Sequence, residues 1–319
     1  MKQTVFELSS AYQTYVWGGN RIATHFQRHH LPPRVAESWE VSDRSEAVST
    51  ILNGPFKGKT LKDVLETMRE DLVGRGRDSN RFPVLIKIID AKQHLSIQVH
   101  PSTSSKGAEA KTECWIALLQ SDVLDGFKAP LTQKALEQSI HDGTLPSLLH
   151  KTSLAPFEAD LIHGGTIHAI LEGAFLYEVQ QNSNTTYRLY DWGRVGVDGK
   201  PRPLHIHEAL DVIDLHPSNG HKQIPIREGK GVYRLVETPF FIVRKIDVEQ
   251  QNDLPLSPDS FLSIFVAAGS GVMVCDGISH HLQCGASFLI AASAKSCKGE
   301  GALTLIATSL PQELTRSAR

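Results

Sequence analysis

The chain of 319 residues is poor in cysteine, in aromatic side chains and in net charge. Its four cysteines include no Cys-x-x-Cys pair, so we expect reduced thiols rather than a disulfide framework. A formal net charge of −2 gives no field that would attract nucleic acid or an anionic membrane. No apolar run is long enough to span a bilayer, and the first eight residues lack the apolar core of a signal peptide. We therefore expect a cytoplasmic protein without nucleic-acid or membrane partners, and leave its oligomeric state open.

The residues that are present favour a mostly β fold in two domains. Helical spacing of apolar residues is confined to 60–73, 131–141, 145–150 and 204–215. Strand patterns occupy 83–90, 95–101, 112–119, much of 159–190, 240–246, 261–266, 271–275, 286–290 and 303–307. Because strands do not alternate with helices, a doubly wound α/β fold is disfavoured, and two jelly-roll sandwiches are favoured. We place the first at 1–215, with a small helical segment near 121–158, and the second at 216–319.

The most informative segment is Leu95-Ser-Ile-Gln-Val-His-Pro101. Apolar and polar residues alternate in it, which indicates a half-buried strand that Pro101 closes. With period two, Leu95, Ile97 and Val99 point to one side, whereas Gln98 and His100 share the other. An amide oxygen and an imidazole then lie side by side on a rigid element, as half of a metal site would require.

Two other predicted strands can complete such a site. Glu113 follows Lys111 with the same spacing of two, and His168 comes directly after a glycine turn. Together with Gln98 and His100, they offer two imidazole nitrogens and two oxygens. This donor set suits a borderline divalent ion such as zinc, with room for water or a substrate oxygen. Without a thiolate in the set, a closed structural zinc site is disfavoured.

The remaining histidines suit a metal less well. His205 and His207 repeat the spacing of two, but they lie in a predicted helix, where such residues do not face each other. His280 and His281 follow Gly277 in what we expect to be a turn.

Several ordered motifs resemble the type I mannose-6-phosphate isomerases, especially their shorter bacterial members. These motifs are Trp17-Gly-Gly19, Ala36-Glu-Ser-Trp-Glu-Val-Ser-Asp43, Phe82-Pro-Val-Leu-Ile-Lys-Ile-Ile-Asp-Ala91, Leu95-Ser-Ile-Gln-Val-His-Pro101, Lys111-Thr-Glu-Cys-Trp115, Gly165-Thr-Ile-His-Ala169 and Gln180-Gln-Asn-Ser-Asn-Thr-Thr-Tyr-Arg-Leu-Tyr-Asp-Trp192. The similarity runs from about residue 10 to 215 in the same order.

The resemblance implies two cupin-type jelly-roll domains and reversible interconversion of mannose 6-phosphate and fructose 6-phosphate. It also implies one zinc ion per chain, in the N-terminal domain. Beyond residue 215 the sequence shows no second Gln-x-His or Lys-x-Glu set, so we expect the C-terminal domain to hold no metal. The family's zinc ligands fall on Gln98, His100, Glu113 and His168. The other implied site residues are Arg188 and Lys111 for catalysis and substrate binding, Glu37 for catalysis, and Lys87 and Trp17 for substrate binding.

The chain departs from the family pattern in two places. His163-Gly164 stands where the family usually has Pro-Ala, and Ser102 replaces a common aspartate. The first change could loosen the loop before His168 or bring a further imidazole near the pocket.

An aldose–ketose isomerase moves a proton between two carbons through an enediol(ate), whose negative charge a metal ion and an arginine can stabilise. The sequence leaves the general base open among Glu37, Lys111 and a metal-activated water. The cation that binds the phosphate is open among Lys87, Lys111 and Arg188. Because Lys87 interrupts an apolar strand, it needs a partner, either Glu37 or Asp90.

Two other classes of function compete with the isomerase. An iron-dependent cupin oxygenase would carry a ligand set richer in histidine. A sugar-binding or regulatory cupin without catalysis would not need the complete ligand set and Arg188.

Overall fold

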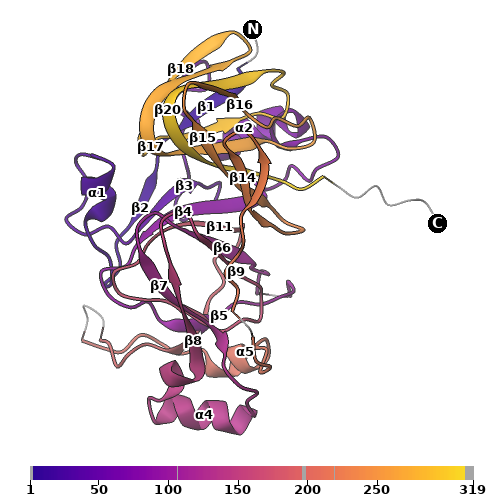
Figure 1. Ribbon diagram of the computed structural model, residues 1–319. Coiled ribbons are helices and arrows are strands. Elements are labelled where there is room, and N and C mark those ends of the chain that lie inside the picture. Colours follow the sequence, from indigo (N-terminus) through magenta and orange to yellow (C-terminus); the bar gives the residue numbers. More distant parts are fainter. Residues whose placement is uncertain (1–2, 106, 196–198, 219, 313–319) are drawn as a thin grey trace. The chain divides into compact units, whose positions relative to one another are not determined.

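The computed structural model describes residues 3–105, 107–195, 199–218 and 220–312, and strands dominate it, as predicted (Figure 1). These residues fall into two compact units. Unit 1 contains the chain up to Ala11, Trp39–Ile86 and the segment from Pro225 onward, whereas unit 2 contains Tyr12–Ser38 and Lys87–Ile224. The domain boundaries at 1–215 and 216–319 stay a prediction. No helix in the described part of the chain is long and apolar enough to cross a membrane.

Unit 1 is built on an antiparallel sheet. Its strands are β1 (Val5–Leu8), β13 (Ile226–Gly229), β14 (Val232–Glu237), β15 (Ile242–Val248), β16 (Gln251–Asp253), β17 (Leu262–Cys275), β18 (Ile278–Gln283), β19 (Ser287–Ile290) and β20 (Cys297–Ser309). Their order is β1-β19-β17-β20-β15-β14-β13, with β18 paired to β17 and β16 paired to β20. Apolar side chains from β1, β15, β17, β19 and β20 form one buried cluster.

The long strand β17 corrects the prediction of two separate strands at 261–266 and 271–275. Its register shifts between Val266 and Ala268, and Gly269 has a φ of +82°. A Cβ at Gly269 would lie 2.0 Å from the carbonyl oxygen of Ala302. The glycine-containing stretch is therefore a bulge within one strand rather than a turn between two.

The actual turn comes later, at Asp276 and Gly277. Their φ angles are +48° and +79°, and they join β17 to β18 in a hairpin. His280 and His281 consequently lie on β18, so the expectation that they occupy a turn is wrong.

A disulfide joins Cys275 and Cys297, so the expectation of reduced thiols is wrong for this pair. The two residues lie directly opposite each other on β17 and β20, with their Cα atoms 4.1 Å apart. Cys114 and Cys284 are free. The sequence could not reveal the pairing, because it depends on the register of strands that are separated along the chain.

Unit 1 also holds the helix predicted at 60–73, which is divided into α2 (Leu61–Met68) and α3 (Glu70–Val73). Thr60 caps α2 as expected: its hydroxyl accepts from the Asp63 amide, and the Asp63 carboxylate accepts from the Thr60 amide. The division falls at Arg69, whose φ is +49°.

Unit 2 contains a five-stranded sheet and most of a six-stranded one. The first has the order β12 (Tyr187–Tyr190), β5 (Ile97–Val99), β10 (His168–Ile170), β7 (Ser121–Phe127) and β8 (Leu149–Leu154). The second has the order β2 (Ala11–Gln13), β3 (Glu37–Val41), β4 (Val84–Asp90), β11 (Phe175–Gln181), β6 (Glu113–Ala117) and β9 (Ala159–Ile162). Val123 of β7 and Leu176 of β11 belong to one buried cluster, so the two sheets enclose a common core, as in a sandwich.

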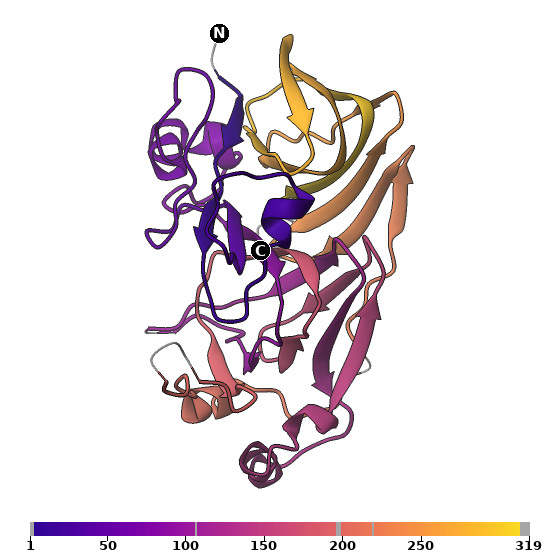
Figure 2. The ribbon, with the colours of Figure 1, turned by 90° about the vertical axis from the view of Figure 1, so that its left-hand side faces the viewer.

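The helical part of unit 2 is smaller than the predicted segment near 121–158. It consists of α4 (Gln133–His141) and a 3₁₀ turn at Leu145–Leu148, and the paired strands β7 and β8 flank it (Figure 2). The predicted helix at 145–150 ends early because β8 begins at Leu149. Two short helices complete the unit: α1 (Arg21–His25) and α5 (Ile206–Leu210).

Candidate active site

Strand β5 presents Gln98 on one side and packs its other side into the core. Ile97 and Val99 are fully buried in a cluster that includes Leu136 of α4. The strand is shorter than predicted, and Leu95, which precedes it, lies in a different cluster from Ile97. The alternation of sides therefore holds only where the backbone is a strand.

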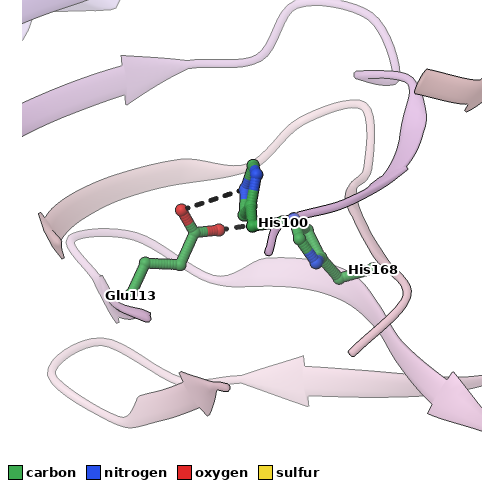
Figure 3. Close-up of side chains that lie close together, drawn as sticks. All are labelled: His100, Glu113 and His168. Carbon is green, nitrogen blue, oxygen red and sulfur yellow. Dashed lines mark ion pairs between the residues drawn. The ribbon is translucent and has the colours of Figure 1, made fainter. Parts of the chain in front are cut away.

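His100, Glu113 and His168 meet in the interior of unit 2 (Figure 3). One ligand atom from each lies within 4.8 Å of the others. The Glu113 carboxylate oxygens are each 3.4 Å from an Nε2 atom, one on His100 and one on His168. The structure thus brings together three of the predicted metal ligands, which come from three separate strands or strand ends.

The far nitrogens of both imidazoles are held by the backbone. His100 Nδ1 is 2.8 Å from the Thr185 carbonyl oxygen, and His168 Nδ1 is 2.8 Å from that of Thr166. Because a carbonyl only accepts, each Nδ1 carries the proton and donates it, which leaves each Nε2 with a lone pair toward Glu113. His100 Nε2 and Glu113 Oε1 are buried without a hydrogen-bond partner, whereas Glu113 Oε2 is ion-paired with Lys111. Such unsatisfied acceptors fit a cation between them.

The electrostatics keep these groups in the protonation states that a metal ion needs. Burial, together with the charge of Lys111, lowers the pKa of His100 to about 3, and burial lowers the pKa of His168. Lys111 Nζ lies 2.6 Å from Glu113 and holds the pKa of that carboxyl well below its usual value against the opposing effect of burial. At neutral pH the cluster therefore offers neutral imidazoles and an ionised carboxylate.

Gln98 lies beside the cluster, opposite His168 in the pairing of β10 with β5. Its amide nitrogen is 3.3 Å from His168 Nε2, and its amide oxygen accepts from the Ser96 hydroxyl. Half a turn of the amide exchanges these two atoms and directs the oxygen toward the cluster.

A cavity of about 290 Å³ adjoins the cluster, and both Gln98 and Lys111 line it. Its other polar lining residues are Glu37, Lys87, Ser96, Glu178, Asn184, Thr186, Arg188 and Arg202. The apolar part of the wall consists of Trp17, Ile89, Leu95 and Ile170, and Tyr15, which stacks on Trp17, joins it. All nine residues that we singled out from the sequence as metal-binding, catalytic or substrate-binding lie in the cluster or line this cavity.

Lys87 is ion-paired with Glu37, as predicted, and also with Glu178, which the sequence analysis did not identify. Lys87 Nζ lies 3.5 Å from Glu37 and 3.7 Å from Glu178, and their charges raise the pKa of Lys87 against the opposing effect of burial. The alternative partner, Asp90, pairs with Arg21 instead. The signal for Glu178 was present, because it is an acidic residue within the apolar run Phe-Leu-Tyr-Glu-Val.

Arg188 lies next to the candidate metal site. It is directly opposite Gln98 in the pairing of β12 with β5, and its guanidinium donates to the Pro203 carbonyl oxygen. The row His168–Gln98–Arg188 thus crosses three neighbouring strands. A substrate in the cavity would contact a candidate ligand and a fixed positive charge together.

Comparison with known proteins identifies the family. The model for the phosphomannose isomerase type I catalytic domain matches residues 5–123, and the model for the mannose-6-phosphate isomerase cupin domain matches residues 232–310. A mannose-6-phosphate isomerase of Streptococcus mutans is 32% identical over 313 residues, covering 94% of this chain and 96% of its own. This chain belongs to the type I phosphomannose isomerases.

Solved phosphomannose isomerase structures agree in fold. The mannose 6-phosphate isomerase from Bacillus subtilis superposes with a TM-score of 0.88 at 29% identity, over 96% of this chain and 99% of that one. A mannose 6-phosphate isomerase bound with zinc and yttrium has a TM-score of 0.78 at 19% identity, over the same shares. The cupin fold expected from the motifs is thereby confirmed.

The two departures from the common phosphomannose isomerase pattern lie against each other. A Cβ at Gly164 would be 2.5 Å from the Ser102 Cα atom, so the glycine allows the two loops to touch. The Gly165 amide also donates to the His100 carbonyl oxygen, at 2.7 Å. His163 is exposed and is not part of the cavity wall. Gly164 and Gly165 thus hold the loop before His168 against the loop after His100.

Proposed function

We propose that this chain is a metal-dependent aldose–ketose isomerase that interconverts mannose 6-phosphate and fructose 6-phosphate through an enediol(ate). One zinc ion per chain would be held by Gln98, His100, Glu113 and His168. The observation that carries the proposal is the buried set of acceptors, His100 Nε2 and both Glu113 oxygens, beside a polar cavity. The zinc held by a structural neighbour supports the choice of ion.

The ion would supply a Lewis acid for the oxygens at C1 and C2 of the sugar. Arg188 would add a fixed positive charge to the cavity wall, because it is opposite Gln98 and lines the cavity. Trp17 would pack against the sugar, and its low exposure of 4% indicates that it is already fixed in place.

Proton transfer at carbon is assigned to the carboxylates around Lys87. Glu178 is buried, and burial together with the charge of Glu113 raises its pKa, which brings it toward that of an effective base at neutral pH. Glu37 lies on the other side of Lys87 and also faces the cavity. Lys87 itself stays protonated and acts by charge. Lys111, the other candidate from the sequence, is paired to Glu113, which makes it a charge partner of the metal site.

A coupled assay for fructose 6-phosphate formed from mannose 6-phosphate tests the proposal. Protein stripped by a chelator should lose turnover and regain it with zinc. Turnover that survives verified removal of every metal would overturn the assignment of the ligands. The assay run without oxygen separates the isomerase from a cupin oxygenase, which would stop. Tight binding of the sugar phosphate without turnover would favour the non-catalytic alternative.

A further inference from the structure

The positive charges along the cavity are not all balanced. Lys87 has carboxylates at 3.5 and 3.7 Å, those of Glu37 and Glu178, and Lys111 has Glu113 at 2.6 Å. Both lysines are thus neutralised by acids of the site itself. A doubly charged phosphate placed there would have to compete with these carboxylates.

Around Arg188, by contrast, the positive charges outnumber the carboxylates that could neutralise them. Arg188 and Arg202 line the cavity, and Arg194 lies close enough for its charge to lower the pKa of Arg188, an effect to which Arg202 and burial contribute more. Asp191 is the carboxylate that acts on all three guanidiniums, because it opposes the lowering of the pKa of Arg188 and of Arg194 and is ion-paired with Arg202. Guanidinium groups do not lose their protons in proteins, so the excess of positive charge is permanent.

The donors of this cluster are also incompletely used. Arg202 directs Nε and one terminal nitrogen at Asp191, with distances of 2.8 and 2.5 Å. Its other terminal nitrogen makes no hydrogen bond or ion pair in the part of the chain that the structure describes. Arg188 Nε is buried and lacks a partner as well. An anion at this end of the cavity would satisfy both.

We propose that Arg202 and Arg188 form the subsite for the substrate's phosphate, with Asp191 as the positioning residue that holds the Arg202 guanidinium. This inference rests on the proposed function and narrows it, since it separates the phosphate from Lys87 and Lys111. The planar fork of arginine matches a phosphate better than an ammonium does. The reacting carbons would then lie toward Gln98 and Lys111, and the phosphate would lie beyond Arg188.

The test compares Arg202→Met with wild type in zinc-loaded protein. We expect kcat/KM for mannose 6-phosphate to fall about 10- to 100-fold, mainly through KM, as for the loss of a hydrogen-bonded charge. Competitive inhibition by inorganic phosphate should weaken by a similar factor, whereas inhibition by unphosphorylated mannose should change much less. Arg202→Lys should recover part of the loss, and Asp191→Asn should raise KM with a smaller effect on kcat.

Arg227→Met is a matched control, because Arg227 is exposed on β13 in unit 1. Unchanged KM and phosphate inhibition in Arg202→Met would overturn the subsite, as would an equal loss of inhibition by mannose. Thermal unfolding with and without inorganic phosphate gives a readout that needs no turnover. If wild type fails as an isomerase but phosphate stabilises it, and stabilises Arg202→Met less, the proposed function is wrong and the anion site stands. If phosphate stabilises neither wild type nor Arg202→Met, the proposed anion site is wrong.

Discussion

Unit 2 contains two groups of buried carboxylates and neighbouring imidazoles that differ in their cations and in their number of carboxylates. In the first, Lys111 contacts Glu113 and keeps it ionised. In the second, which consists of Asp125, Asp160 and His221, no lysine or arginine is ion-paired with either carboxylate within the described residues. Asp125 is 3.4 Å from His221 Nδ1, whereas both Asp160 oxygens are buried without a hydrogen bond.

The missing cation changes what the second group can do. Burial and the nearby charge of Asp125 raise the pKa of Asp160 to about 7, and the neighbouring Asp125 carboxylate raises the pKa of His221. Asp160 and His221 therefore tend to keep their protons, whereas Glu113 in the first group stays negatively charged. The comparison teaches that residue type alone does not make a metal site: a buried carboxylate must also be kept ionised by its surroundings.

The largest expected effect comes from removing the charge at the centre of the first group. Glu113→Gln preserves size but leaves Lys111 buried without its carboxylate. We expect loss of bound zinc and a fall in turnover of more than about 100-fold, since even partners of metal ligands contribute 10- to 100-fold. Metal analysis and the coupled assay measure both. A variant that keeps its zinc and its rate would show that the two groups do not differ as described.

A smaller effect, on stability rather than activity, is expected in the second group. The folded Asp160 carboxyl keeps its proton up to a pKa of about 7, whereas the unfolded one loses it near the ordinary pKa of 3.8. Stability should therefore fall as the pH rises through this window, with a slope of up to about 1.4 kcal/mol per pH unit from this residue.

Asp160→Asn should flatten that slope, and denaturant unfolding between pH 5 and pH 8 measures it. Its turnover at neutral pH should remain within a few-fold of wild type. Identical slopes in the two proteins would mean that Asp160 does not hold a proton in the folded state.

The smallest effect is expected at His163, near His221 of the second group. Burial and the charge of His221 lower its pKa, but its side chain is exposed and is not part of the cavity wall. His163→Gln should change kcat/KM by less than about two-fold, in line with other surface substitutions. A large loss would mean that the imidazole takes part in the site after all.

The candidate site was largely predictable because its residues interrupt strong local patterns. Gln98 and His100 are polar positions of an alternating strand, and Lys87 is a charge within an apolar one. Glu178 carried the same signal on β11 but was overlooked. Arg202 had no comparable signal, because its role depends on an ion pair with Asp191, 11 residues earlier in the chain.

The fold was less predictable where it depends on the backbone conformation of a glycine or on the register between distant strands. The stretch around Gly269 reads as a turn in sequence, yet the facing strand β20 converts it into a bulge. The Cys275–Cys297 pair depends on the same register. Such outcomes follow from long-range pairing, which no local window contains.

The carbonyl of Thr185 connects the candidate metal site to the segment that lines the cavity. It accepts from the His100 ring, while Asn184 and Thr186, its neighbours in the chain, line the cavity wall. A displacement of that ring pulls on the peptide between the two wall residues. If the proposed ion is held there, an ion of a different radius would therefore shift the His100 ring and, through this peptide, the cavity wall that the sugar would contact.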